Sequence, residues 1–116
     1  MYYIYMIRCE DDSLYTGITN NLNKRMKEHF YKTSECAKYT RSHPAKNLEA
    51  CWMCETRSEA AKLEYAIKSF SKSDKEKVVF SSDYLNNFEI NLKGKYTPLE
   101  KKQLEICMEE IKKMSL

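Results

Sequence analysis

Residues 2–19, YYIYMIRCEDDSLYTGIT, decide the fold of this chain. The first part, 2–8, is rich in aromatic and β-branched residues and carries no charge before Arg8, which is typical of a strand buried on both faces. The polar cluster at 10–13 predicts a turn, and residues 14–18 predict a second, short strand. Together these segments predict an antiparallel hairpin.

One of only two glycines in the chain, Gly17, lies inside the second predicted strand, where a glycine weakens strand structure. Side chains alternate along a strand, so Tyr15 and Gly17 share one face of the second predicted strand, and a hairpin can bring Tyr5 onto the same face. The missing side chain of Gly17 leaves a gap on this face. The gap either lets a ligand or another backbone come close, or it reflects a bulge or tight packing under a helix. Strand geometry alone favours the bulge or the packing.

The residues after the hairpin predict a helix, a loop and a third strand. Capping residues at 19–21 precede a helix to about Tyr31, in which apolar residues recur at every fourth position. Residues 32–46 are polar, basic and interrupted by Pro44, which predicts an exposed loop. Residues 47–55 predict the third strand.

Two capping boxes predict the next two helices. Thr56 and Glu59 begin a helix whose apolar positions face the core. Ser73 and Glu76 form a similar box, which predicts a second helix that ends near Leu85.

The C-terminal part predicts an extended stretch and a final helix. Apolar and polar residues alternate at 88–92, as in a strand. Residues 97–100, TPLE, combine an N-cap, a proline at the first helical position and a glutamate two positions later, which is the strongest helix start in the sequence. The amphipathic helix that follows either packs on its own domain or contacts a partner, and we expect it to pack on its own domain.

This order of elements, β-β-α-β-α-α with a helical extension, predicts an α+β fold with a small three-stranded antiparallel sheet flanked by helices. We expect residues 1–82 to form the main domain. Residues 83–116 then form a C-terminal extension that ends in an amphipathic helix packed on the same domain. With 116 residues, of which 42% are hydrophobic, the chain is long enough to bury a core of its own.

The charge of the chain is mildly positive and unevenly distributed. The formal net charge is +3, and residues 1–80 carry 14 Lys and Arg against 11 Asp and Glu, whereas residues 81–116 carry 6 of each sign. The basic surplus therefore belongs to the first part of the chain. Such a small excess permits a polyanionic partner without requiring one.

The five cysteines are odd in number and scattered, which does not fit the disulfide framework of a small secreted domain, so we expect reduced thiols. The pair Cys51 and Cys54 lacks the further ligands that a zinc site needs. The apolar runs are too short to span a membrane, and the N-terminal residues do not resemble a leader. We therefore expect a soluble, cytoplasmic protein without a membrane partner.

Several side chains of this pattern can serve one reaction. Arg25 and His29 lie four residues apart on one helix face, although such a pair alone is more often solvated surface. Glu64 lies on the capped helix, where it either belongs to a site or pairs with Lys68. Phosphodiester hydrolysis needs a base for water, a cation beside the phosphate and usually a divalent metal with a carboxylate ligand. The tyrosines, Arg25, His29 and Glu64 provide these groups, because Mg²⁺ keeps several waters and accepts a single carboxylate.

Taken in order, these residues resemble the motifs of the GIY-YIG nuclease superfamily. Within it the chain is similar to the short stand-alone bacterial proteins related to the catalytic subunit of structure-selective endonucleases. The resemblance covers about residues 1–80, and the chain departs from the pattern at Tyr3, in place of the first glycine, and at Thr16, in place of the middle isoleucine. The segments that carry it are YIY at 3–5, LYTGIT at 14–19, KRMKEH at 24–29, AKYTR at 37–41 and RSEAAKLEYAIKSFS at 57–71.

The resemblance implies a metal-dependent endonuclease that cleaves a nucleic-acid strand with activated water and one Mg²⁺ or Mn²⁺ ion. We expect DNA in preference to RNA, in repair or recombination. By position, the resemblance assigns Tyr5 and Tyr15 to the two motif tyrosines, Gly17 to the closing glycine, Arg25 to the catalytic arginine, His29 to the helix histidine and Glu64 to the metal-binding glutamate.

A second group of residues predicts contacts to nucleic acid. Lys38, Tyr39 and Arg41 interleave basic and aromatic side chains, which suits phosphate and an unstacked base. The alternative is a solvated loop with Tyr39 packed against the domain. Lys68 is a further candidate, since it or Ser71 can replace the additional polar residue, often asparagine, that the family carries after the glutamate helix.

For the mechanism, we expect Tyr5 to accept the proton of the attacking water, with His29 or Tyr15 positioning it. Positive charge at Arg25 and at a metal on Glu64 would favour the phenolate. The alternatives are a non-catalytic nucleic-acid-binding module on the same fold and an interaction subunit that works through its C-terminal helix. A protein partner for substrate targeting fits either case, and the oligomeric state stays open.

Overall fold

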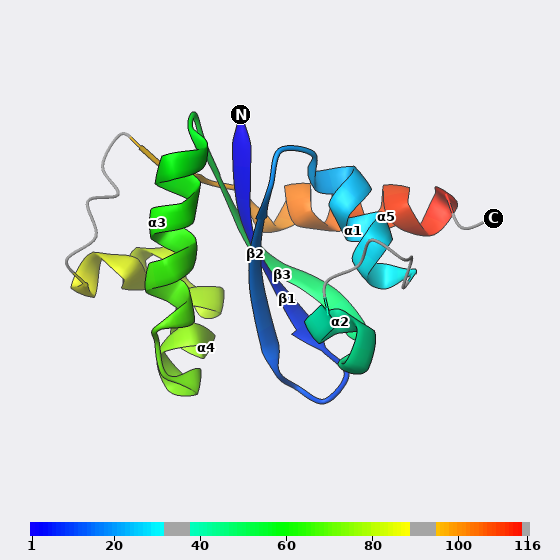
Figure 1. Cartoon of the computed structure of the whole chain (residues 1–116), viewed down its shortest axis with the longest axis horizontal. Coiled ribbons are helices and arrows are strands. Elements are labelled where there is room, and N and C mark those ends of the chain that lie inside the picture. The colour runs from blue at the N-terminus through cyan, green and yellow to red at the C-terminus, as the bar shows by residue number, and fades with distance from the viewer. Residues whose placement is uncertain (32–37, 89–94, 115–116) are drawn as a thin grey trace.

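The computed structural model describes residues 1–31, 38–88 and 95–114. In chain order its elements are β1 (Tyr2–Cys9), β2 (Leu14–Thr19), α1 (Leu22–Phe30), α2 (Lys38–Ser42), β3 (Ala45–Cys54), α3 (Arg57–Lys68), α4 (Lys72–Phe80), the 3-10 helix η1 (Ser82–Asn87), β4 (Thr97–Pro98) and α5 (Lys101–Met114). Figure 1 shows the sheet between two helical layers, with α3 and α4 on one side and α1, α2 and α5 on the other. The predicted α+β fold, an antiparallel sheet flanked by helices, is therefore confirmed.

The sheet has four antiparallel strands in the order β2-β1-β3-β4, which is one strand more than predicted. The additional strand is β4, a two-residue segment that pairs with the outer edge of β3 at Trp52 and Met53. The prediction that residues 97–100 begin a helix is wrong, because Thr97 and Pro98 are extended and paired in the sheet. A hydrogen bond from the Leu99 N–H to the Cys51 carbonyl, 2.9 Å long, continues this attachment. Sheet pairing thus outweighs a favourable local capping pattern.

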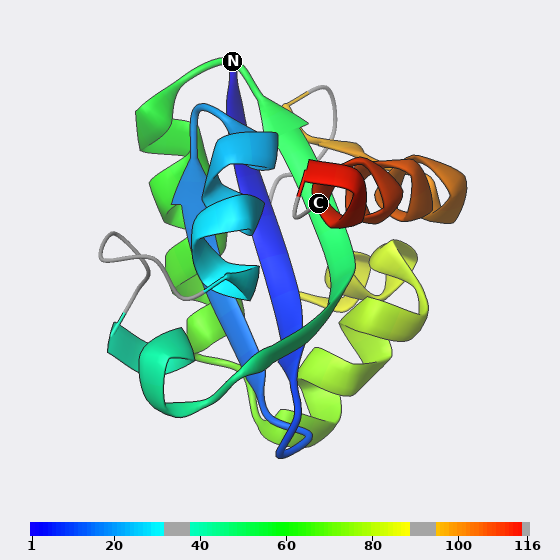
Figure 2. The ribbon, with the colours of Figure 1, turned by 90° about the vertical axis from the view of Figure 1, so that its right-hand side faces the viewer.

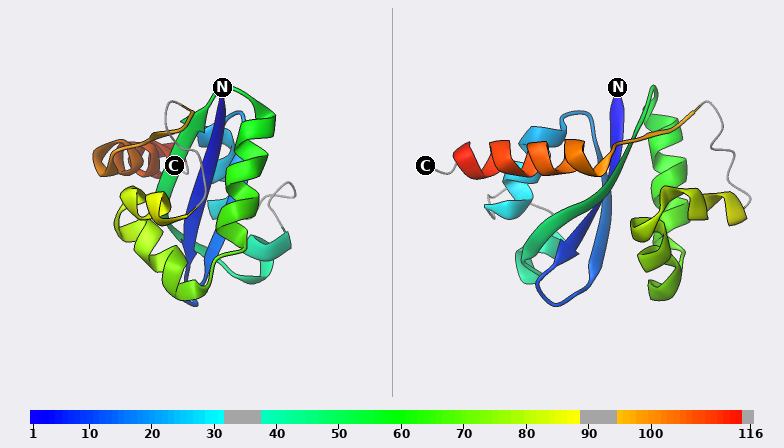
Figure 3. Two further views of the ribbon diagram at one scale, coloured as in Figure 1. Left: turned by 90° about the vertical axis from the view of Figure 1, so that its left-hand side faces the viewer. Right: turned by 180° about the vertical axis from the view of Figure 1, so that it is seen from behind.

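Strand β1 lies at the centre of the sheet and contributes to a core on each face, as its uncharged sequence predicted. Ile4 and Met6 pack on the α3 and α4 side, whereas Tyr5, Ile7 and Cys9 pack on the α1 and α5 side. Figure 3 shows α3 and α4 over the first face, and Figure 2 shows α5 beside α1 over the second. The second core also contains four buried residues of α5, which are Leu104, Cys107, Met108 and Ile111.

The caps predicted for α1 and α3 are present. The Asn21 side chain accepts a hydrogen bond from the Lys24 N–H at 3.2 Å, and Thr56 accepts one from the Glu59 N–H at 3.2 Å. Each cap satisfies a backbone donor that a helix otherwise leaves unpaired in its first turn. These caps fix the starts of the two helices that carry Arg25, His29 and Glu64.

The cap predicted for the following helix is wrong. Ser71 accepts the hydrogen bond from the Asp74 N–H at 3.1 Å, and α4 ends at Phe80 instead of continuing to Leu85. Glu76 does not serve as a cap residue, because both its carboxylate oxygens bind the Arg8 guanidinium at 2.5 Å.

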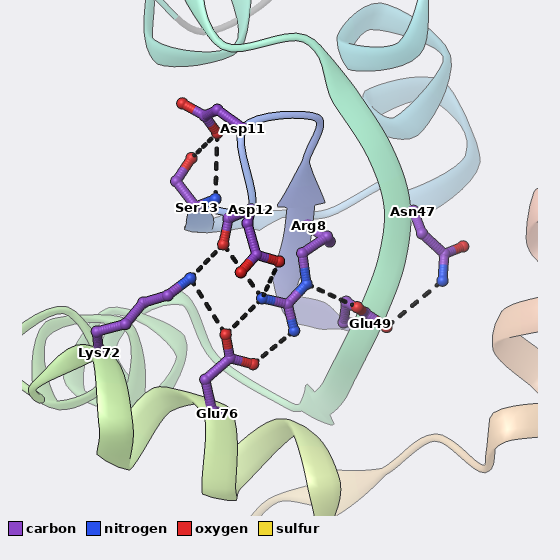
Figure 4. Close-up of polar contacts among 8 residues, drawn as sticks. All are labelled: Arg8, Asp11, Asp12, Ser13, Asn47, Glu49, Lys72 and Glu76. Carbon is purple, nitrogen blue, oxygen red and sulfur yellow. Dashed lines mark hydrogen bonds and ion pairs between the residues drawn. The ribbon is translucent and has the colours of Figure 1, made fainter.

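Arg8 is the centre of a polar network that joins three parts of the fold (Figure 4). Besides its two bonds to Glu76 of α4, its Nε donates to Glu49 of β3 at 2.9 Å, and Nη1 lies 3.4 Å from Asp12 in the turn between β1 and β2. Lys72 bridges the same turn and Glu76, with its Nζ 3.1 Å from Glu76 Oε2. The network holds α4 against the closed end of the hairpin, and we refer to it below as the Arg8 cluster.

The predicted loop at 32–46 is partly wrong. Residues 38–42 form the short helix α2, and residues 45–46 already belong to β3. Residues 32–37 lie outside the described part of the chain, as do 89–92 of the predicted extended stretch at 88–92. Over the described ranges, every helix is too short or too polar to traverse a lipid bilayer.

Candidate active site

The two predicted tyrosines lie on the same face of the hairpin. Tyr5 of β1 pairs across the strands with Gly17, and Ile7 pairs with Tyr15, so Tyr15 is the diagonal neighbour of Tyr5. Their ring centroids are 6.3 Å apart. The period of two along each strand therefore brings the phenols together, as the sequence predicted.

The ring of Tyr5 occupies the gap above Gly17. A Cβ atom placed on Gly17 would lie 2.5 Å from the Tyr5 Oη and 2.7 Å from its Cζ, much closer than van der Waals contact. Strand geometry favoured a bulge or tight packing at Gly17. The pairing of β1 with β2 runs through this position without a register shift, so there is no bulge, and the structure shows tight packing instead. Gly17 is thus required for close packing of the Tyr5 ring across β2.

His29 lies at the centre of the site. Its side chain is fully buried, its Nε2 is 2.7 Å from the Tyr5 hydroxyl, and its Nδ1 is 2.7 Å from the Thr40 hydroxyl. The imidazole centroid is also 5.4 Å from the ring centroids of both Tyr5 and Tyr15. The interpretation of His29 as solvated surface is therefore wrong, and α1 directs this side chain into the sheet.

Burial sets the protonation of these two groups. Removal from water, together with the nearby charge of Arg25, lowers the pKa of His29 to about 4, so the imidazole is neutral at pH 7. Burial, with a smaller contribution from Tyr15, raises the pKa of Tyr5 well above the ordinary phenol value, although Arg25 partly opposes this rise. In the protein alone Tyr5 therefore carries its proton.

Arg25 lies beside the Tyr5 hydroxyl with its charge partly exposed. Its Nη1 donates to Glu28 Oε1 at 2.7 Å, and the guanidinium also interacts with the Tyr5 phenol, whose pKa it lowers. Burial alone would lower the pKa of Arg25, but the interactions with Glu28 and Tyr5 outweigh it and raise the pKa. A fixed positive charge thus lies next to the phenol.

Glu64 approaches the tyrosines from the other side of the sheet. Because β2 is the edge strand and α3 lies on the face opposite α1 (Figure 1), α3 residues reach Tyr15 at this edge. The Lys68 Nζ is 5.7 Å from the Tyr15 ring centroid and 3.6 Å from Glu64 Oε2. The Glu64 carboxylate is half-buried, and its charge is near enough to Tyr5 to raise the pKa of the phenol.

The donor atoms fit a magnesium-like ion better than zinc. Glu64 offers one carboxylate, whose charge acts on the Tyr5 phenol, and this suits an ion that takes few protein oxygens and keeps several waters. Within residues 1–31, 38–88 and 95–114 there is no group of three or more His, Cys, Asp or Glu side chains that could hold a metal. Cys51 and Cys54 lie in the cores on opposite faces of the sheet, which excludes a shared zinc ion at this pair.

Three of the predicted nucleic-acid residues lie on α2, whereas the fourth, Lys68, lies at the end of α3. Lys38 and Arg41 are exposed, whereas Tyr39 is half-buried and stacks on His43 at 4.2 Å and on Tyr15 at 5.5 Å between ring centroids. The structure therefore favours the alternative in which Tyr39 packs against the domain. Through Tyr39, α2 is attached to the tyrosine cluster.

Thr40 is the site residue that the sequence did not indicate. It is fully buried and binds His29, although 11 positions and a connection that includes residues 32–37 separate the two residues in the chain. Thr40 lies in the segment AKYTR that carries the family resemblance, but a single threonine between Tyr39 and Arg41 does not indicate a contact with His29. Only the tertiary contact identifies it.

The model of the GIY-YIG catalytic domain matches residues 1–78 of this sequence. The chain belongs to the GIY-YIG family. All the predicted site residues lie inside the matched segment, whereas η1, β4 and α5 lie beyond it.

Close GIY-YIG relatives are short proteins. A UPF0213 protein of Fusobacterium nucleatum is 43% identical over 82 residues, which is 71% of this chain and 80% of the relative. A UPF0213 protein of Staphylococcus saprophyticus is 41% identical over 78 residues, 67% of this chain and 93% of the relative. A solution NMR structure of a UPF0213 protein from Bacillus halodurans, 35% identical, covers 78% of this chain and 98% of its own, with a TM-score of 0.46. The two sequence relatives confirm the resemblance to a short stand-alone branch of the family.

Proposed function

We propose that this GIY-YIG protein is a metal-dependent endonuclease that hydrolyses phosphodiester bonds of DNA. The observation that carries the proposal is the Tyr5–His29 hydrogen bond of 2.7 Å, with Tyr15, Arg25 and the charge of Glu64 around it. These residues come from β1, β2, α1 and α3, so only the folded chain brings them together. Together they provide a proton acceptor, a cation and a carboxylate, the groups that phosphodiester hydrolysis requires.

Arg25 and Glu64 provide the electrostatic part of the reaction. The Arg25 guanidinium, held by Glu28, would stabilise charge that develops on a phosphate. Glu64 would hold one Mg²⁺ or Mn²⁺ ion, which when bound supplies a second positive charge at the phosphate. The Lys68 ammonium, 3.6 Å from Glu64, provides a further contact for the strand.

Tyr5 is the proposed base, and His29 receives the proton that Tyr5 must give up. As the phenol oxygen takes a proton from the attacking water, its own proton passes to His29 Nε2, the neutral nitrogen 2.7 Å away. The water oxygen then bonds to phosphorus, and the bond from phosphorus to the leaving oxygen breaks. Tyr15, half-buried at the edge strand, positions the water beside Tyr5.

Burial of Tyr5 supports a second candidate function. The side chain is only 1% exposed, and its pKa is raised, which is unfavourable for a base that must meet water. A non-catalytic nucleic-acid-binding module on the same fold would keep Lys38 and Arg41 exposed and would tolerate this burial. A partner protein that selects the substrate is compatible with either function.

A cleavage assay on branched, single-stranded and duplex DNA with Mg²⁺ or Mn²⁺ tests the proposal. We expect cleavage by the native protein, none by Glu64→Gln, and full cleavage by Glu109→Gln, which changes an exposed glutamate on α5. Circular dichroism checks that the Glu64→Gln protein is folded. If the native protein binds DNA and leaves every substrate intact, the binding module is the correct function. Unchanged cleavage by Glu64→Gln would refute the metal role.

A further inference from the structure

Thr40 and Tyr5 engage the two nitrogens of one buried imidazole. The side chains of Tyr5, His29 and Thr40 are 1%, 0% and 0% exposed, and both contacts are 2.7 Å long. Water therefore does not compete for either nitrogen. Which group donates and which accepts in this chain of hydrogen bonds therefore depends on the protein groups alone.

The neighbours of Tyr5 determine the direction of these hydrogen bonds. The Arg25 guanidinium interacts with the Tyr5 phenol and can only donate, so the phenol proton points away from Arg25 and toward His29 Nε2, 2.7 Å from the phenol oxygen. Because the imidazole is neutral, the nitrogen that accepts cannot also carry hydrogen. Nε2 is then the acceptor, and Nδ1 carries the hydrogen and donates it to the Thr40 hydroxyl oxygen.

We propose that Thr40 is a positioning residue that holds His29 in the tautomer with hydrogen on Nδ1, so that the Nε2 lone pair faces the Tyr5 hydroxyl. Its oxygen, 2.7 Å from Nδ1, fixes both the tautomer and the orientation of the ring. This role extends the proposed function. It rests on that function in one respect, which is that the oriented Nε2 accepts a proton during the reaction.

Thr40 accepts the same hydrogen bond before and after that transfer. When the Tyr5 proton moves to Nε2, the products are a phenolate and an imidazolium, and total charge is unchanged. The imidazolium donates through both nitrogens, from Nε2 to the Tyr5 oxygen and from Nδ1 to Thr40. No group has to turn during the step, which is how positioning residues assist proton transfer.

NMR of the imidazole nitrogens tests the tautomer without any assay of cleavage. The chain has only two histidines, His29 and His43, so spectra of a His43→Gln protein report His29 alone. We expect a neutral ring with hydrogen on Nδ1 in this protein and in Thr40→Ser, which keeps the hydroxyl. Thr40→Val has the same shape without an acceptor, and we expect it to shift His29 toward the Nε2–H tautomer. Hydrogen on Nε2 of His29 in the protein that retains Thr40, or an unchanged tautomer in Thr40→Val, would overturn the assignment.

Kinetics then test the connection to catalysis. We expect Thr40→Val to lower kcat by on the order of 10-fold to 100-fold with little change in KM, and Thr40→Ser to restore it. Thermal unfolding of both variants separates this effect from simple loss of structure. A shifted tautomer with unchanged kcat would refute the link to catalysis. If the native protein cleaves nothing, the proposed nuclease function fails while the tautomer experiment still tests Thr40.

Discussion

Gly17 determines where the Tyr5 ring lies, and its replacement should therefore change the site. In Gly17→Ala the new methyl group would overlap the Tyr5 ring, so we predict a loss of about 1–3 kcal/mol in the free energy of unfolding, measured in urea. Because the nearest atom is the Tyr5 Oη, the same substitution in a Tyr5→Phe background should cost less. Equal losses in the two backgrounds would show that the overlap is relieved elsewhere.

His29 should make the stability of the protein depend on pH. The pKa of His29 is lowered to about 4 in the folded protein, whereas an unfolded histidine has a pKa of about 6.5. Below about pH 6.5 the unfolded chain therefore binds a proton that the folded chain does not. Stability is full above this value and falls as pH decreases toward 4, by about 2 kcal/mol between pH 7 and pH 5.

Urea unfolding of the His43→Gln protein at the two pH values measures this effect with His29 as the only histidine. Glu76 does not interfere, because hydrogen bonds from Arg8 lower its pKa to about 2, and its contribution is lost only at more acidic pH. Equal stability at pH 7 and pH 5 would mean that His29 is protonated in the folded protein.

At the scale of single residues, strand periodicity predicted the common face of Tyr5, Tyr15 and Gly17, because that relation depends only on neighbours in one hairpin. The contact of His29 with Thr40 was not predictable, since it forms between an α1 side chain and a short helix whose position no local pattern fixes. The sequence also did not predict that the Tyr5 ring, on the neighbouring strand, fills the space above Gly17.

The Arg8 cluster controls how α4 is attached to the sheet. Arg8 is 14% exposed and faces the carboxylates of Glu49 and Glu76, so Arg8→Met leaves two half-buried negative charges without their shared partner. We predict a loss of about 2 kcal/mol in the free energy of unfolding, between the values for exposed and for buried ion pairs. Arg57→Met, at an exposed position on α3, is the matched control and should be within about 0.5 kcal/mol of the native protein. Similar stability of the two variants would contradict a structural role for the cluster.

Helix α2 is the element expected to hold the DNA backbone. Lys38 and Arg41 are exposed on it, so Lys38→Gln with Arg41→Gln should make the slope of log affinity against log salt shallower by about 2. Binding is measured with the Glu64→Gln protein, so that cleavage does not interfere. Lys101→Gln with Lys102→Gln, on exposed positions of α5, should leave the slope unchanged. An equal effect of the two pairs would indicate that binding is not centred on α2.

At the scale of elements, periodicity and caps predicted α1, α3 and the three longer strands. Two of the elements that were not predicted, β4 and α2, were missed for the same physical reason. Strand β4 and helix α2 are too short to be stable by themselves, and each is held by contacts across the fold, β4 by Trp52 and Met53 and α2 by Tyr15 and His29.

At the scale of the whole molecule, part of the hydrophobic core of the protein lies outside the segment that the family model matches. Four buried residues of α5 share a core with Tyr5, Ile7 and Met26. We predict that residues 1–82 alone lose about 5 kcal/mol or more of stability, a large part of what a domain of this size possesses. Circular dichroism in urea should show a broad, non-cooperative transition, and a cooperative transition at the native midpoint would contradict this prediction.

Two isoleucines of α5 provide a matched comparison that leaves the chain intact. Ile111 is 1% exposed, and Ile111→Ala should cost about 2–4 kcal/mol, whereas Ile106 is 46% exposed and Ile106→Ala should cost about 0.5 kcal/mol or less. The amphipathic pattern of α5 was visible in the sequence, but its position against α1 and β3 was not. The pattern predicts which face of the helix is buried and does not indicate which elements cover that face.

The central position of β1 has a consequence for the timing of substrate binding. Tyr5 is on the strand that hydrogen-bonds to neighbours on both sides, and strands of this kind release their amide hydrogens to solvent only when the entire domain unfolds. The backbone that carries the phenol is therefore among the slowest parts of the molecule to move. Its geometry is preorganised before any nucleic acid arrives, and adjustment to the ligand must come from side chains at the β2 edge.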